Sequence, residues 1–214
     1  PMALVLPGAA LLRWSGLKEE ARTRSLLPLA GRLAAAGLLA FLIFRVFQPY
    51  AFTGPGFFNM LPSEQWVNTM RSIAAQNAGD VDFPPQLQWA RRPIWFSLQN
   101  QVLWGLGVAL GVSAWSAYLW MGWLLLSRPG EFRRRYVLIW LWTGLYFVWQ
   151  STAAARTLRY MMPIYPLLMV IAAWGLCEWQ GIWRTRGVIR RLIPELTAGL
   201  AVILTALWAL AFTS

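Results

Sequence analysis

Two arginines stand just before a long apolar segment, where their side chains could bind an anion. Arg156 and Arg159 are three residues apart, so on a helix they would share one face, and the apolar run 167–177 follows them. Guanidinium groups at a membrane surface can hold a lipid phosphate through paired N–H···O bonds. They can equally serve only to anchor the helix, by extending to the water at the membrane surface. The residues alone leave both interpretations open.

A second candidate group lies between 80 and 92. Asp80 and Asp82 are two residues apart, so on an extended segment both side chains point the same way. They could act as a catalytic base and its orienting group, or they could form a turn and pair with Arg91 and Arg92. The arginine pair could hold a phosphate or a headgroup, or remain solvated in a loop. Two aspartates make a poor metal site, so we expect no metal and no cofactor.

The composition restricts the class of protein. The chain of 214 residues is 58% hydrophobic and only 13% charged, which is typical of proteins that cross a membrane several times. It has no histidine and one cysteine, which excludes His-ligated haem, the usual zinc sites and a disulfide within the chain. The net charge of +11 comes from arginines in short clusters between apolar segments. This pattern indicates cytoplasmic loops, and we expect no nucleic-acid partner.

We expect helices to position the candidate arginines and aspartates. A membrane-spanning helix needs about 20 apolar residues. We predict an all-α integral membrane protein that forms a single membrane domain over 1–214. Its five spans are expected at about 27–47, 102–126, 136–155, 160–178 and 192–212. The apolar start, Met2–Leu12, is too short to span, and we interpret it as the tail of a truncated helix in a fragment of a longer protein.

The charges predict how the spans are oriented. Loops 13–32, 127–135 and 178–191 carry thirteen of the 19 basic residues, so we expect them in the cytoplasm. The long loop 48–101 and the Arg156/Arg159 pair then face outside. Within that loop, Ser63 should cap a short helix over about 64–78 that Gly79 ends. In the second span, Gly107 and Gly111 form a Gly-x-x-x-Gly pair that permits close helix contact.

A family resemblance extends this interpretation. The run Arg159-Tyr-Met-Met-Pro-Ile-Tyr-Pro166 resembles the Arg-Tyr-x-x-Pro-x-Tyr-Pro pattern in a late helix of polytopic C-type glycosyltransferases. Most of 30–180 is similar to family 39, the protein O-mannosyltransferase and aminoarabinose-transferase type. The resemblance implies transfer of a sugar from a polyprenyl-phosphate donor on the external face of a bacterial plasma membrane.

The resemblance also implies roles for individual residues. Arg156 and Arg159 would contact the donor phosphate, and Tyr160 and Tyr165 would lie beside the prenyl or sugar moiety. The family's catalytic carboxylate lies in its first external loop, which we expect before Pro1. In the alternative, Asp80 or Asp82 takes that role.

A different class of function fits the same residues. The Trp-rich spans, the Gly-x-x-x-Gly pair and the lack of a complete catalytic set are also typical of a non-catalytic integral membrane subunit in a larger membrane complex. The expected partners are membrane lipid and the polyprenyl-phosphate sugar donor, together with other membrane subunits or the missing N-terminal part.

Overall fold

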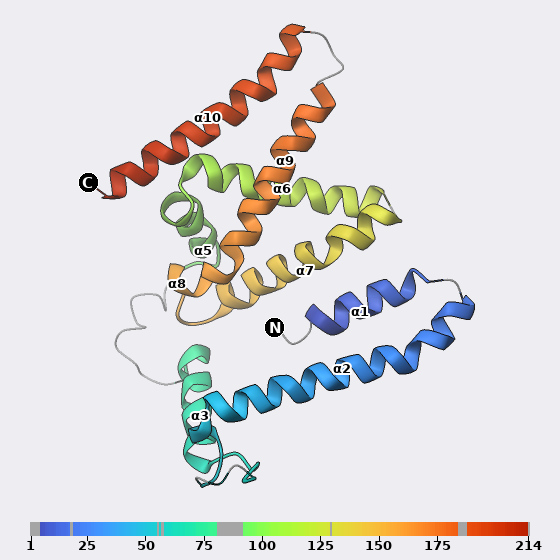
Figure 1. Ribbon diagram of the computed structural model, residues 1–214. Coiled ribbons are helices and arrows are strands. Elements are labelled where there is room, and N and C mark those ends of the chain that lie inside the picture. Colours follow the sequence, from blue (N-terminus) through green and yellow to red (C-terminus); the bar gives the residue numbers. More distant parts are fainter. Residues whose placement is uncertain are drawn as a thin grey trace. The chain divides into compact units, whose positions relative to one another are not determined.

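The computed structural model describes residues 5–17, 19–54, 56, 58–80, 92–128, 130–183 and 188–213. Over these residues the chain is helical, and it forms no β-strand beyond an isolated bridge between Phe52 and Pro62. This agrees with the predicted helical class. The chain divides into two compact units, Pro1–Ala90 and Arg91–Ser214 (Figure 1).

The first unit is built around one long helix. Its elements are α1 (Val5–Ser15), α2 (Glu19–Phe47), a 3-10 turn η2 (Pro49–Ala51) and α3 (Glu64–Ala78). α1 packs against α2 as a helical hairpin. The indole N–H of Trp14 closes the hairpin by donating a hydrogen bond of 3.0 Å to the carbonyl oxygen of Arg22.

α3 lies where the capping residues predict it. The Ser63 hydroxyl accepts a hydrogen bond from the backbone N–H of Trp66, which satisfies one of the free donors of the first turn. Gly79 ends the helix in the left-handed conformation, with φ of 84°. The predicted helix 64–78 is therefore confirmed at both ends.

Arg45, near the end of α2, is covered by the loop that follows it. Only 4% of this residue is exposed. Its guanidinium group donates a hydrogen bond of 2.5 Å to the carbonyl oxygen of Gly56 and lies 4.9 Å from the ring centroid of Phe52. A buried arginine must find acceptors inside the protein, and the loop 49–62 supplies one.

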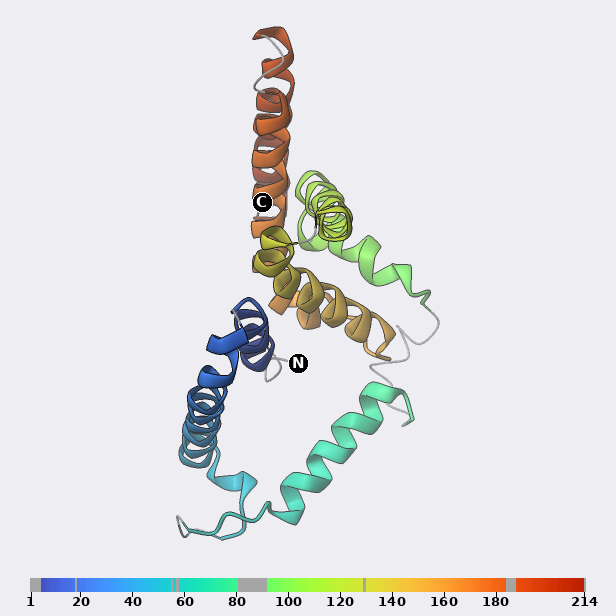
Figure 2. The ribbon, with the colours of Figure 1, turned by 90° about the vertical axis from the view of Figure 1, so that its right-hand side faces the viewer.

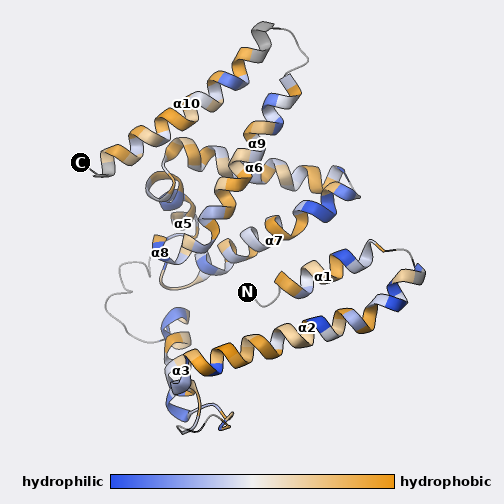
Figure 3. Cartoon of the chain, in the orientation of Figure 1, coloured by the Kyte–Doolittle hydropathy of each residue, from blue (hydrophilic) through white to orange (hydrophobic). Residues whose placement is uncertain are grey.

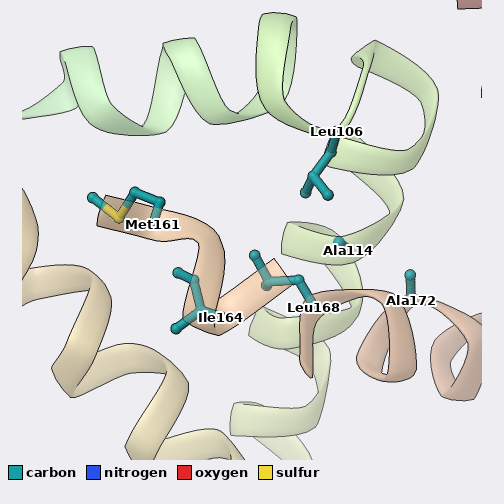
Figure 4. Close-up of a cluster of buried hydrophobic side chains, with 6 residues drawn as sticks. All are labelled: Leu106, Ala114, Met161, Ile164, Leu168 and Ala172. Atoms are coloured by element: carbon teal, nitrogen blue, oxygen red, sulfur yellow. The ribbon is translucent and has the colours of Figure 1, made fainter. Parts of the chain in front are cut away.

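The second unit packs around α6. Its elements are α5 (Trp95–Asn100), a π-helical turn η3 (Gln101–Gly105), α6 (Val108–Ser127), α7 (Glu131–Thr152), α8 (Leu158–Met161), a 3-10 turn η4 (Met162–Ile164), α9 (Tyr165–Trp183) and α10 (Val188–Thr213). α6 contacts α7, α9 and α10. Six buried residues fill the space around the start of α9: Leu106, Ala114, Met161, Ile164, Leu168 and Ala172 (Figure 4).

The beginnings of α6 and α9 and the ends of α7 and α10 lie on one side of this unit, at the left in Figure 1. α10 returns along α9, and the two helices overlap in Figure 2. The turn between α6 and α7 lies on the opposite side of the unit. Arg156 and Arg159 therefore lie at the other end of the unit from the basic start of α7.

The helix is interrupted within the predicted span 102–126, just before α6. The backbone N–H of Leu106 bonds the carbonyl of Gln101 at 2.9 Å, which closes the π turn, and Gly107 then takes φ of 78°. Glycine adopts that conformation without steric cost. A Cβ at Gly107 would lie 2.8 Å from the Trp208 ring of α10, and one at Gly111 would lie 2.8 Å from the Val102 backbone. The glycine pair thus lets the π turn fold onto α6 and admits Trp208.

Over the residues that the structure describes, four helices are long and apolar enough to cross a membrane: Ala21–Phe47, Val108–Ser127, Leu158–Trp183 and Leu192–Ala211 (Figure 3). α7 covers 136–152 of the predicted span 136–155 but is not among them, since its arginines and many Trp and Tyr residues lower its hydropathy. The last helix begins at Val188, so Pro194 lies in its second turn and not in the first turn of a helix that starts at 192.

Candidate lipid-phosphate site at the start of α8

Arg156 lies in the linker between α7 and α8 and is half-buried. Its Nε donates a hydrogen bond of 3.2 Å to the carbonyl oxygen of Ala153, and its Nη1 donates to the carbonyl oxygen of Arg92. The predicted helical face shared by Arg156 and Arg159 is wrong, because Thr157 is extended and α8 begins only at Leu158. Arg156 therefore ties its linker to the segment that leads into α5.

Arg159 is exposed in the single turn of α8. Its guanidinium carbon lies 5.7 Å from the ring centroid of Tyr160, within the range of a cation–π contact. Among the residues that the structure describes, no carboxylate lies within ion-pair distance of Arg159. The guanidinium group thus keeps its hydrogen-bond donors available at the beginning of the apolar segment Leu158–Trp183.

Tyr160 is held in place through its backbone. The hydroxyl of Tyr146 on α7 donates a hydrogen bond of 2.8 Å to the Tyr160 carbonyl oxygen, while the Tyr160 side chain is 38% exposed. This bond fixes α8 against the end of α7. The ring next to Arg159 is accessible to a bound molecule.

Tyr165 is separated from the exposed side of α8, because its hydroxyl is buried against Gly105 in the π turn. A Cβ at Gly105 would collide with that hydroxyl. Within the described part of the chain the hydroxyl has no hydrogen-bond partner. The structure thus places Tyr165 inside the helix packing, whereas Tyr160 lies beside Arg159.

Further buried polar side chains occur in the second unit, and nothing in the sequence marked them as site residues. Gln101 is fully buried and Ser97 is 3% exposed, and their side chains lack hydrogen-bond partners in the described residues. They are four residues apart, which places them on one face of the α5–η3 segment. Ser151 on α7 is equally buried and unpartnered. Such groups normally bind water or a polar ligand. In the sequence, the i, i+4 spacing of Ser97 and Gln101 was the pattern that could have indicated this pair.

The structure brings some of the remaining predicted residues together. Arg92 receives the hydrogen bond of Arg156 on its carbonyl, and its own guanidinium carbon lies 5.1 Å from the Phe96 ring centroid. Asp80 follows the end of α3, where its backbone N–H bonds the carbonyl of Ala75 at 3.0 Å. Asp82 and Arg91 lie outside the described residues. Over those residues, no group of three or more His, Cys, Asp or Glu side chains could hold a metal ion.

Comparisons with known proteins add no relative. No protein-family model, curated protein or solved structure matches the chain. The functional interpretation therefore depends on the geometry around Arg159 and on the residues that surround it.

Proposed function

We propose that this chain is a membrane glycosyltransferase, or the helical part of one, that binds a polyprenyl-phosphate sugar donor at the start of α8. The observation that carries the proposal is the exposed guanidinium group of Arg159 at the entrance to an apolar segment long enough to span a membrane. A phosphate on a lipid chain needs a cation at the membrane surface, with apolar surface directly below it.

An apolar stripe supports a lipid in preference to a water-soluble phosphate. Met162, Met169 and Val170 are 60%, 47% and 57% exposed. Met162 follows Arg159 by three residues and the other two lie further along α9, so exposed apolar side chains continue from α8 into α9. A prenyl chain attached to a phosphate at Arg159 would follow these side chains.

Arg156 has a positioning role in this proposal. Two backbone carbonyls already occupy its Nε and Nη1, so it orders the linker that leads to Arg159. Arg92 lies beside this linker, because its carbonyl oxygen accepts the hydrogen bond of Arg156, and its guanidinium group adds a positive charge. Tyr160 lies beside the phosphate-binding group, whereas the buried Tyr165 acts on the donor only through the packing of α9.

The orientation of the chain belongs to the same proposal. α6 and α9 begin on the same side of their unit, so the chain between them must return, and α7 does this over 22 residues, or about 33 Å. We therefore count α7 as a further crossing. With the basic turn near 127–135 in the cytoplasm of a bacterial cell, Arg159 faces outside.

Sugar transfer also needs a general base, and the described residues near Arg159 include no carboxylate partner. The base stays a prediction from the sequence, which is a carboxylate in the family's first external loop or, in the alternative, Asp80 or Asp82. The role proposed for α8 itself is to bind the donor phosphate.

A second candidate function is a non-catalytic subunit of a membrane complex. The apolar windows of α2 and α10 are only 0% and 6% buried within the structure, so both helices present nearly all their apolar surface to lipid or to another protein. Purification as a stable stoichiometric complex, without binding of polyprenyl phosphate, would favour this function.

The proposal is tested by binding a fluorescent polyprenyl phosphate to the purified chain in lipid nanodiscs. Hydrogen bonds to charged groups contribute about 1.5–3 kcal/mol, so Arg159→Ala should weaken binding by about ten- to a hundredfold. Arg133→Ala, an exposed arginine at the basic start of α7, is the matched control and should bind like the unmodified chain. Equal binding by all three proteins would contradict the proposal.

A further inference from the structure

The hairpin of α1 and α2 forms an open, basic cavity far in sequence from α8. The cavity measures about 430 Å³ and lies entirely within the first unit. Three arginines line it: Arg13 from α1, and Arg24 and Arg32 from α2. Arg24 and Arg32 are eight residues apart, so they lie on neighbouring faces two turns apart, about 12 Å along the helix.

Arg22, close to the turn of the hairpin, has a structural role that separates it from these three. The guanidinium group of Arg22 donates to the carbonyl oxygen of Ser15, and its central carbon lies 5.6 Å from the Trp14 ring centroid. Arg22 therefore holds α1 and α2 together. The side chains of Arg13, Arg24 and Arg32 are exposed and, in the described part of the chain, make no hydrogen bond or ion pair.

Among the lining residues that the structure describes, the positive charge has no carboxylate to balance it. Guanidinium groups on both sides of a cavity repel one another, and an anion between them removes that repulsion. A phosphate is a suitable anion, since its oxygens accept paired N–H···O bonds from several arginines at once.

Apart from Ser25, the remaining described lining is largely apolar, which indicates that the anion belongs to a lipid. Small and aliphatic side chains, including Ala10, Ala21 and Leu29, lie between the arginines. α2 includes the apolar segment Ala21–Phe47, which is long enough to cross a membrane. Basic pockets beside membrane helices are typical sites for anionic lipid headgroups.

We propose that the α1–α2 hairpin is a binding site for an anionic glycerophospholipid. Its phosphate lies among Arg13, Arg24 and Arg32, and its acyl chains follow the apolar side of α2. This site is independent of the donor site at α8, because it uses different residues in the other unit. It would fix the position of the hairpin at the membrane surface.

The test measures lipid retained by the purified full chain, by native mass spectrometry after delipidation and addition of a defined lipid. Phosphatidylglycerol and cardiolipin are the probes, and phosphatidylcholine is the neutral comparison. We expect the chain to retain the anionic lipids at least tenfold better than phosphatidylcholine. The triple variant Arg13→Gln, Arg24→Gln, Arg32→Gln should lose that preference.

The matched control removes three arginines from the basic turn between α6 and α7, as Arg128→Gln, Arg133→Gln, Arg134→Gln. It should retain the anionic lipids like the unmodified chain, because no hairpin residue changes. An equal loss in both triple variants would overturn the proposal, since the effect would then depend on net charge alone. Equal retention of anionic and neutral lipids would also overturn it.

A competition with inorganic phosphate and a pair of single variants complete the test. Displacement of the lipid by millimolar inorganic phosphate would assign the cavity to a soluble anion and overturn the lipid proposal. If the hairpin triple variant fails to fold, as judged by circular dichroism, the single variants Arg24→Gln and Arg32→Gln replace it. Each should lower retention about threefold, and unchanged retention in both would overturn the proposal.

Discussion

The guanidinium group of Arg156 donates a hydrogen bond to the backbone carbonyl oxygen of Arg92, a residue 64 positions earlier in the chain. This bond joins the linker before α8 to the segment that leads into α5. Since Arg156 uses a second donor on Ala153, its role is to order the linker, while Arg159 three residues later stays exposed. The two arginines that look equivalent in the sequence have different roles in the structure.

Arg156→Gln should destabilise the second unit. The substitution removes hydrogen bonds from a charged donor, each worth about 1.5–3 kcal/mol, and leaves the Arg92 carbonyl without this partner. We expect a fall of about 1–3 kcal/mol in the free energy of unfolding, measured by chemical denaturation in detergent micelles.

The neighbouring arginine provides the control for that experiment. Arg159→Gln removes an equal charge from an exposed position and should change the unfolding free energy by less than about 0.5 kcal/mol. Equal destabilisation by the two substitutions would contradict the different roles assigned to them.

Gly105→Ala should destabilise the packing of the π turn on α9. The added methyl group would overlap the Tyr165 hydroxyl, and overpacking of this kind costs about 1–3 kcal/mol. Adding Tyr165→Phe removes the overlapping oxygen and should restore part of the loss. A thermal unfolding series over the two single variants and the double variant measures this coupling.

Gly181 on α9 offers the matched comparison for Gly105. A Cβ at Gly181 meets no atom within 4 Å. Gly181→Ala should therefore stabilise the helix by about 0.5–1 kcal/mol, because alanine has the higher helix propensity. A similar loss of stability at both glycines would show that the Tyr165 hydroxyl is not the cause at Gly105.

Ser63→Ala should weaken α3. The hydroxyl caps the Trp66 N–H and also donates a hydrogen bond of 3.1 Å to the carbonyl of Tyr50, so its loss frees the helix start and detaches the preceding loop. We expect a cost of about 1 kcal/mol, seen as faster amide hydrogen exchange in the first turn of α3. Ser72→Ala, at an exposed position inside the same helix, should slow exchange or leave it unchanged; faster exchange there would contradict a specific capping role.

Local rules predicted the parts of the fold that depend on neighbours in sequence. Ser63 and Gly79 fix both ends of α3 through their own backbone and side-chain preferences, and the predicted ends are the observed ones. The apolar segments were placed in the same way, from length and composition, and four of them overlap the helices that, in the described residues, are long and apolar enough to cross a membrane.

Contacts between residues far apart in the sequence determine the features that the sequence did not predict. Gly107 breaks the helix where Trp208 from α10 approaches it, and nothing near Gly107 distinguishes that break from an ordinary glycine in an apolar helix. Arg156 leaves the helix of Arg159 because Thr157 is extended, and its hydrogen-bond partner lies beyond α5 and α6 in sequence. The exposed Arg159 was a predicted site residue, whereas the buried Gln101 was not selected, since burial of a polar side chain depends on tertiary packing.

The most direct test of the proposed site combines membrane sidedness with phosphate binding. Met162→Cys, in a Cys177→Ser background, places a thiol on the exposed residue one turn after Arg159 and leaves the arginine intact. A membrane-impermeant maleimide added to intact cells should label it, and polyprenyl phosphate should slow that labelling in the purified protein at least threefold. Leu126→Cys, exposed near the basic turn, should be labelled only after the cells are opened. Labelling of Met162→Cys only in opened cells, or at a rate that polyprenyl phosphate leaves unchanged, would contradict the site proposed at α8.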